Sequence, residues 1–233
     1  RNRIYAIESP SYKKIEQVYK ATEITYDPLS LGHSGINSDA LAATKASVLH
    51  TTPYRSYPSG VTATASKRHE YIRWSEQNNR YIIEDDYDSE YRLSGQPIPT
   101  LQSIDIQEKV IYMNTFSQTI SPSMRVGFMV LPPRLLERYR RELGFYACTV
   151  PALEQHVLTR FLERGYYEQH LSRMRKEYRL RWQRVLDAFR SSPFSNRISI
   201  SEQGAGLHFL LRVDTDLSDR ELCEGLARSG IRI

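Results

Sequence analysis

Short apolar runs alternate with amphipathic stretches along the first half of the chain, at the spacing of strand–helix units. The apolar runs predict strands at residues 3–7, 23–26, 47–51, 80–83, 109–113 and 125–130. Between them the pattern predicts helices, most clearly at 13–20 and 66–78, with Ser66 as the N-cap of the second. This alternation favours an α/β fold in which helices cover both faces of a mainly parallel sheet.

The pattern changes after Pro151 to long helices. Apolar residues recur every three or four positions over 166–190, which predicts one long helix with a single apolar stripe. Its other face is rich in arginine, which is typical of a solvated helix face, with contact to an acidic surface as the alternative. Further on, the sequence predicts strands at 198–200 and 207–213 and a helix from about Ser218.

These patterns divide the chain into a large α/β domain over 1–165 and a second part over 166–233. The second part comprises the long connecting helix and a small α+β domain. The chain opens and stops within strand-like runs and does not start with methionine. We therefore expect it to be a fragment in which both domains are incomplete.

Composition and charge exclude several classes of protein. No stretch of the 233 residues approaches the ~20 apolar residues that a membrane-spanning helix needs, so no membrane partner is expected. Cys148 and Cys223 lie far apart without a cysteine or histidine cluster, which argues against a disulfide scaffold and a metal centre and favours a cytoplasmic location. The net charge of +5 is too small to indicate nucleic-acid binding by itself.

The densest polar cluster, Glu84 to Asp88, follows the apolar run at 80–83. Ligands of open parallel sheets bind beyond the carboxyl ends of strands, which makes this cluster a candidate site. A magnesium site is one interpretation, but the chain has no phosphate-binding GxxxxGK[ST] loop, and a solvated acidic turn is another. The third is a carboxylate that faces a cationic heterocycle, such as the pyridinium ring of pyridoxal 5′-phosphate (PLP). Asp85 and Tyr87 would then point into the pocket together, because residues two apart in an extended segment share a side.

A second polar cluster covers residues 114–125, between two predicted strands. The hydroxyls of Thr115 and Ser117 and the guanidinium of Arg125 are the groups that bind a phosphate dianion. A plain surface loop would be equally rich in serine and threonine, so this cluster alone does not identify a site.

Together, the two clusters and their surroundings resemble the fold type I, PLP-dependent aminotransferases, and among them the effector domain of MocR-type (GntR superfamily) transcription regulators. The resemblance covers nearly the whole chain. The matching runs are ESPSY at 8–12, TP through YPSG at 52–60, IIEDDYDSEY at 82–91, TFS through RVG at 115–127 and AGLH at 205–208. The part at 83–91 is the most diagnostic of the regulator branch.

The resemblance implies a role for each matching residue. Tyr12 would stack on the pyridine ring, Asp85 would pair with the ring nitrogen, and Tyr87 would bond the ring hydroxyl. Thr115, Ser117 and Arg125 would hold the phosphate, so that 1–165 would be the PLP-binding domain. The resemblance also implies a homodimer, a small-molecule effector that is PLP or derived from an amino acid, and DNA binding through a domain absent from this chain.

Two departures from the family pattern fall at the site. The pattern has a lysine after TFS, which forms the Schiff base with PLP, whereas this chain has Gln118. An amide is neither a nucleophilic amine nor a base, so Gln118 cannot perform the lysine's catalytic roles. The second departure is Tyr54-Arg55-Ser56, where the regulators usually have Ser-His-Gln.

These departures leave three functions open. We expect first an effector-sensing regulator domain that is inactive as a transaminase and binds PLP without a covalent bond. The alternative is an enzyme, a class I aminotransferase present as a fragment or as a lysine-less variant. The third is a binding or structural protein that has lost PLP. A helix-turn-helix segment upstream of Arg1 would favour the regulator over the enzyme.

Overall fold

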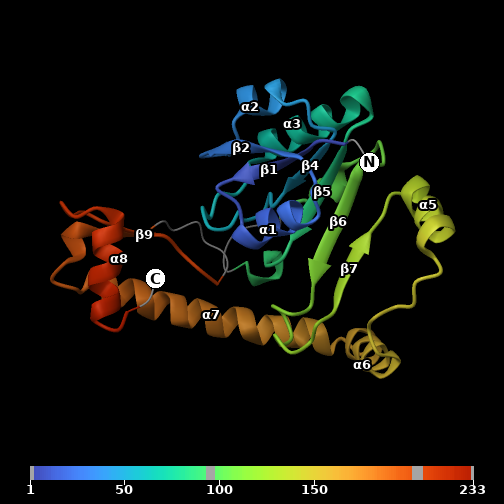
Figure 1. Cartoon of the computed structure of the whole chain (residues 1–233). Helices are drawn as coiled ribbons and strands as arrows, with labels where there is room; N and C mark the ends of the chain where they lie inside the picture. The colour runs from blue at the N-terminus through green and yellow to red at the C-terminus, as the bar shows by residue number, and fades with distance from the viewer. Residues whose placement is uncertain (1–2, 93–97, 201–206, 232–233) are drawn as a thin grey trace.

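A computed structural model describes residues 3–92, 98–200 and 207–231 (Figure 1). Within these residues, the main sheet has seven strands in the order β3-β2-β1-β4-β5-β6-β7. The strands are β1 (Tyr5–Ser9), β2 (Tyr26–Gly32), β3 (Gly35–Ile36), β4 (Val48–Thr51), β5 (Tyr81–Asp86), β6 (Val110–Thr115) and β7 (Gly127–Val130). Strands β2, β1, β4, β5 and β6 are parallel, and β3 and β7 are antiparallel edge strands. This mainly parallel architecture confirms the predicted α/β fold class.

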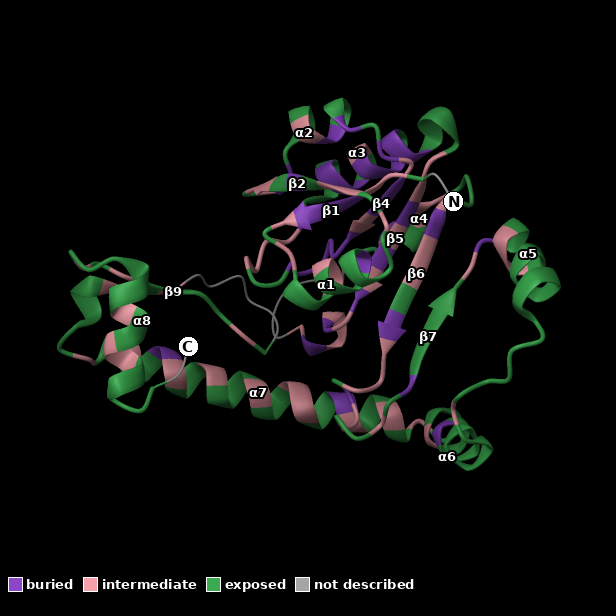
Figure 2. Ribbon diagram, viewed as in Figure 1, coloured by how far each residue is buried: buried purple, intermediate pink, exposed green. Residues whose placement is uncertain are grey.

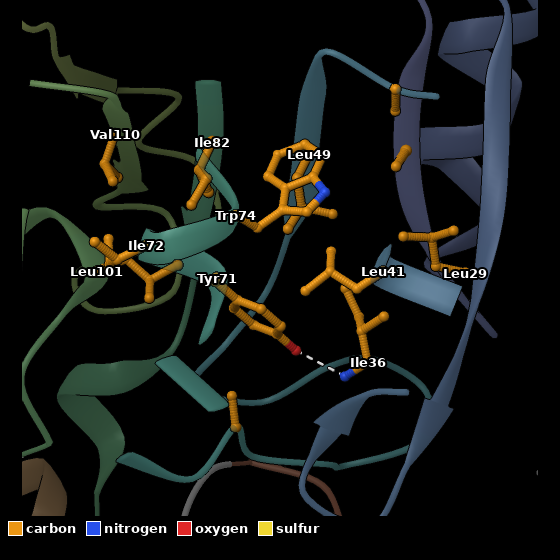
Figure 3. Close-up of a cluster of buried hydrophobic side chains, with 13 residues drawn as sticks. Leu29, Ile36, Leu41, Leu49, Tyr71, Ile72, Trp74, Ile82, Leu101 and Val110 are labelled. Atoms are coloured by element: carbon orange, nitrogen blue, oxygen red, sulfur yellow. Dashed lines mark hydrogen bonds between the residues drawn. The ribbon is translucent and has the colours of Figure 1, made fainter. Parts of the chain in front are cut away.

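One face of the sheet carries the hydrophobic core (Figure 3). Leu49 and Ile82 from the strands are fully buried there against Tyr71 and Trp74 of helix α3 (Ala65–Glu76). The Tyr71 hydroxyl also accepts a hydrogen bond of 2.7 Å from the backbone N–H of Ile36, which ties α3 to edge strand β3. Two short helices, α2 (Ser38–Ala43) and α4 (Leu101–Ile104), add Leu41 and Leu101 to the same face.

The opposite face is covered by helix α1 (Lys13–Ala21). Side chains of a strand alternate between the two faces, so the neighbours of the core residues point toward α1. Accordingly, the Tyr19 ring of α1 contacts the Tyr5 ring, with 5.3 Å between centroids, and its hydroxyl lies 3.0 Å from Nδ1 of His50. Asp85 shares the face of His50, whereas Glu84 and Asp86 are directed to the other side.

The C-terminal part is built around the long helix α7 (Tyr166–Arg190), which runs past the lower end of the sheet (Figure 1). It is attached through the rings of Tyr91 and Tyr178, 5.2 Å apart, and through Arg175, whose Nε donates to the Glu90 carbonyl at 2.6 Å. The remaining elements are α5 (Pro133–Leu143), α6 (Ala152–Glu163), β8 (Ile198–Ile200), β9 (Leu211–Val213), α8 (Asp219–Arg228) and the 3₁₀ turns Gln77–Asn79, Ser89–Tyr91 and Ser195–Arg197. Figure 2 shows that α5, α6 and α8 are largely exposed.

Several predicted boundaries were wrong. The strand expected at 23–26 begins only at Tyr26 and continues through Pro28, which is tolerated because β2 is paired on one side only at that position. The strand expected at 207–213 covers only Leu211–Val213, the residues paired with β8. Helix α3 is capped by Thr64, whose side chain accepts from the N–H of Lys67, rather than by Ser66.

One other prediction of the C-terminal part is confirmed. The helix expected from about Ser218 is α8, with Ser218 as its N-cap. The predicted domain boundary coincides with the first residue of α7, Tyr166, and the division into two domains stays a prediction. In the part of the chain that the structure describes, no helix combines the length and apolar character required to cross a bilayer.

Candidate functional site

A cavity of about 600 Å³ lies beyond the carboxyl ends of the parallel strands. Its walls are formed by the N-terminal end of α1, the loop after β4, the segment at the end of β5 and the loop between β6 and β7. All seven residues predicted from the sequence line it: Tyr12, Asp85, Tyr87, Thr115, Ser117, Gln118 and Arg125. The other lining residues are Ile15, Thr52, Tyr57, Asp88, Leu207 and His208. The structure thus brings together residues that lie more than a hundred positions apart in the sequence.

Asp85 presents its carboxylate to the cavity from the end of β5, with 27% of its side chain exposed. Its Oδ2 lies 3.7 Å from Nε2 of His50, and Nδ1 of that histidine lies 3.0 Å from the Tyr19 hydroxyl. Asp86 does not line the cavity. Its side chain points away from it and accepts hydrogen bonds from the Tyr112 hydroxyl at 2.8 Å and the Ser89 hydroxyl at 2.7 Å. The alternation expected from the strand therefore separates the two acids.

Aromatic rings form one wall of the cavity. Tyr12 is 41% exposed and meets the ring of Tyr57 edge to face at 5.6 Å, and Tyr57 meets His208 at 5.2 Å. The Tyr87 hydroxyl donates to the backbone carbonyl of Arg55 at 3.1 Å, and burial raises its pKa. Tyr87 therefore stays protonated, and its O–H is the donor to the Arg55 carbonyl.

The loop between β6 and β7 gathers hydroxyls around a guanidinium. Thr115 Oγ1 and Ser117 Oγ lie 3.1 Å apart, and Arg125 Nη1 lies 3.4 Å from Ser117 Oγ. The Ser117 hydroxyl also donates to the Met124 carbonyl, which fixes the loop. Hydroxyls and a guanidinium held this close can bind a phosphate group.

Gln118 is exposed within this loop and contributes to the cavity wall. Its backbone carbonyl accepts a hydrogen bond of 2.7 Å from the Tyr91 hydroxyl, which fixes the main chain at this position. The side chain is thereby held at the cavity while its main chain is anchored to the segment after β5. An amide there can bind polar groups, but it supplies no nucleophile or base.

No local sequence pattern indicates the role of Glu8, which is 5% exposed at the end of β1. Its carboxylate accepts hydrogen bonds from the Thr51 hydroxyl, from the Thr52 N–H at 3.0 Å and from the Ser56 hydroxyl at 2.5 Å. Burial raises its pKa, and these hydrogen bonds oppose that shift. Glu8 thus fixes the loop that carries Thr52 and Tyr57 into the cavity.

Removing this carboxylate should destabilise the protein. Glu8→Ala leaves three buried donors without an acceptor, and we expect a loss of about 2 to 4 kcal/mol of unfolding free energy. Urea denaturation measures the loss. Glu16→Ala is the matched control, since Glu16 makes only a surface pair with Lys20 at 3.8 Å and should change stability by less than about 0.5 kcal/mol. Equal midpoints for the two variants would contradict the role of Glu8.

The sequence of this chain is similar to those of several curated proteins. The chain is 35% identical over 226 residues to the HTH-type transcriptional regulator YhdI of Bacillus subtilis, which is 97% of this chain and 48% of that protein. It is 31% identical over 225 residues to the probable rhizopine catabolism regulatory protein MocR of Rhizobium meliloti, 97% of this chain and 45% of the relative. The chain thus spans about half the length of the curated relatives it matches. No protein-family model matches it.

Solved structures give the same fold. Kynurenine aminotransferase of Pyrococcus horikoshii superposes with a TM-score of 0.83 at 24% identity, over 99% of this chain and 59% of the other. LysN, the α-aminoadipate aminotransferase of Thermus thermophilus, was solved with N-(5′-phosphopyridoxyl)-L-leucine and superposes with a TM-score of 0.82 at 23% identity, over 99% of this chain and 60% of the other. At these identities the comparison shows that the chain has the aminotransferase fold.

Proposed function

Since this chain is a homologue of the MocR-type HTH regulators and has the aminotransferase fold, we propose that it is the effector-sensing domain of such a regulator. The observation that carries the proposal is the cavity at the strand ends, where every residue of the predicted PLP site meets around Gln118. In this proposal the chain binds PLP without a covalent bond and is not a transaminase.

The residues present fit this cofactor. Asp85 would pair with the ring nitrogen, Tyr12 would stack on the ring, and Tyr87 would form a hydrogen bond with the ring hydroxyl. The phosphate would be held by the Thr115 and Ser117 hydroxyls and by Arg125, because these lie together at one wall. PLP, when bound, supplies an electron-withdrawing ring. The chain's own residues would bind and orient it, while Gln118 can neither bond to it nor move a proton.

The partners follow from the relatives. DNA binding would reside in a part of the protein outside this chain, since the chain spans about half of each HTH-type relative. Among the described residues there is no group of three or more His, Cys, Asp and Glu side chains that could hold a metal ion. We further propose a homodimer, with the loop of Tyr57 near the partner's site, and a cytoplasmic location.

The test of this function is reversible, non-covalent binding. PLP should bind the protein and be removed completely by dialysis, because Gln118 has no amine. Treatment with borohydride before dialysis should leave residue 118 unmodified in peptide mass spectra. PLP bound to other lysines on the surface would be a random background spread over several peptides.

Two results would contradict the proposal. A stoichiometric reduced adduct on one lysine of the cavity would show that covalent chemistry is retained. An absence of PLP binding in titration calorimetry would show that the protein belongs to the class that has lost the cofactor.

A further inference from the structure

His50 of β4 lies behind the carboxylate that Asp85 presents to the cavity. The register of β4 and β5 pairs His50 with Ile83, and Asp85 follows two residues further along β5, so both side chains share one face of the sheet. His50 Nε2 lies 3.7 Å from Asp85 Oδ2, and 12% of the histidine side chain is exposed. His50 does not itself line the cavity, so its contact with the site runs through Asp85.

The other ring nitrogen of His50 is held by helix α1. The Tyr19 hydroxyl lies 3.0 Å from His50 Nδ1, and the centroids of the two rings are 5.9 Å apart. Tyr19 is 7% exposed, and burial raises the pKa of its hydroxyl, so the hydroxyl keeps its proton. Tyr12, Ile15 and Tyr19 recur every three or four residues. The side of α1 that lines the cavity therefore also carries the hydroxyl that holds His50.

The two neighbours of His50 determine where its proton lies. An ionised carboxylate can only accept hydrogen bonds, so the nitrogen that faces Asp85, Nε2, carries the hydrogen of the neutral imidazole. Nδ1 then has a free lone pair, and the Tyr19 hydroxyl donates to it. Nε2 is buried and has no hydrogen-bond partner among the residues that the structure describes, so no other acceptor there competes with Asp85 for this N–H.

The second acid near His50 is already occupied. Glu8 of β1 lies close enough for the charge of His50 to lower its pKa. However, its carboxylate accepts hydrogen bonds from Thr51, Thr52 and Ser56. The Asp85 carboxylate is instead open to the cavity, with 27% of its side chain exposed. The imidazole of His50 is the group placed to orient it.

We propose that His50 is a positioning residue, which donates its Nε2–H to Asp85 and thereby holds the carboxylate directed at the ring nitrogen of the ligand. The inference rests on the proposed function, in which Asp85 pairs with that nitrogen. It extends the site from the cavity wall to a chain of three side chains, Tyr19, His50 and Asp85, in which each donates to the next. Groups that orient a binding side chain in this way contribute to affinity without touching the ligand.

Two probes separate the ring nitrogen from the rest of the ligand. Pyridoxamine 5′-phosphate has the nitrogen, and its 1-deaza analogue has a C–H group in the same place. In titration calorimetry at constant pH, the wild type should bind pyridoxamine 5′-phosphate about 10 to 100 times more tightly than the analogue. His50→Phe should lower the affinity for pyridoxamine 5′-phosphate by about 3- to 10-fold and leave that for the analogue unchanged, because only the first depends on Asp85.

Conservative variants test each step of the chain of hydrogen bonds. His50→Gln keeps an N–H donor, and its affinity for pyridoxamine 5′-phosphate should stay within about twofold of the wild type. Tyr19→Phe removes the donor to Nδ1 and should cause a loss of about threefold for this probe alone. Tyr26→Phe is the matched control and should bind both probes like the wild type. The ring of Tyr26 lies 5.7 Å from that of Tyr19, but its hydroxyl forms no hydrogen bond with the described residues.

A double variant shows whether the two residues act together. In the Asp85→Asn background, His50→Phe should cause no further loss of affinity, because the carboxylate that it positions is gone. An additional loss as large as that in the wild type would show that His50 acts independently of Asp85 and would overturn the proposal. Equal losses of both probes in His50→Phe would assign His50 to packing, and an unchanged affinity would remove its role altogether.

The remaining outcomes separate this inference from the proposed function. If the wild type binds both probes equally, Asp85 does not face the ring nitrogen, and the positioning role fails while the cofactor cavity stands. If neither probe binds the wild type, the proposed function fails, and the positioning role fails with it. If His50→Phe does not fold, the comparison of Tyr19→Phe with Tyr26→Phe decides. Equal affinity of these two variants for pyridoxamine 5′-phosphate would overturn the proposal.

Discussion

Gln118→Lys is expected to convert the cavity from reversible to covalent PLP binding, the largest change that a single substitution should cause here. Lysine supplies the primary amine that condenses with the aldehyde of PLP, and this amine would project from a main chain already fixed by the Tyr91 hydroxyl. We expect a new visible absorbance band and one reduced adduct per chain at residue 118 after borohydride. Absorbance spectra and peptide mass spectrometry measure both.

Gln118→Met controls for the loss of the amide without the gain of an amine, and it should give neither the band nor the adduct. If the lysine variant also stays unmodified while PLP still binds, the other departure at the site, Tyr54-Arg55-Ser56, must have displaced the cofactor from residue 118. In that case both departures from the family pattern, and not Gln118 alone, would prevent the covalent bond.

The sheet was predictable because its strands are nearly continuous apolar runs. Ile82 and Ile83 are followed at once by acids, but β5 continues through Asp86, so this sharp change marks the acidic cluster rather than the end of the strand. The short antiparallel strand β3 was missed, since Gly35–Ile36 is too short to show any periodicity. Strand β2 was misplaced for a related reason: only Leu29 is buried in it, so its sequence is almost as polar as a loop.

The residues that line the cavity were predictable where they are close together in sequence. Side chains alternate between the two faces of a strand, so Asp85 points to the cavity and Asp86 points away from it. The hydroxyls of Thr115 and Ser117 lie next to each other in the loop after β6. The supporting residues act over long sequence separations. Glu8 binds Thr51 and Ser56 across 43 and 48 positions, and no local pattern encodes such contacts.

The histidine behind Asp85 illustrates the same limit. His50 belongs to an apolar strand, where it is indistinguishable from a structural residue. Only the pairing of β4 with β5 places it beside the carboxylate, at 3.7 Å, with Tyr19 on its other nitrogen.

Asp85→Asn should weaken binding of pyridoxamine 5′-phosphate by about 10- to 100-fold. The carboxylate would pair with the protonated ring nitrogen, and the amide forfeits a charge-assisted bond of roughly 1.5 to 3 kcal/mol. Pyridoxamine 5′-phosphate is the suitable probe because it has no aldehyde and cannot react with surface lysines. Titration calorimetry at constant pH measures the change, and the fold should be retained because Asp85 is partly exposed.

Asp86→Asn is the matched control, one residue along the same strand. It should leave the affinity nearly unchanged and instead lower stability by about 1 to 3 kcal/mol, since its carboxylate accepts from Tyr112 and Ser89 on the side away from the cavity. A magnesium site would respond differently, because both variants would then lose ligand and added Mg²⁺ would restore it. Equal losses of affinity in the two variants would reject the assignment of Asp85 to the ring. If neither variant loses affinity for the ligand, residues 84–88 are a solvated turn and not a binding site. Only a carboxylate in contact with the ring makes the affinity depend on which of the two neighbouring acids is substituted.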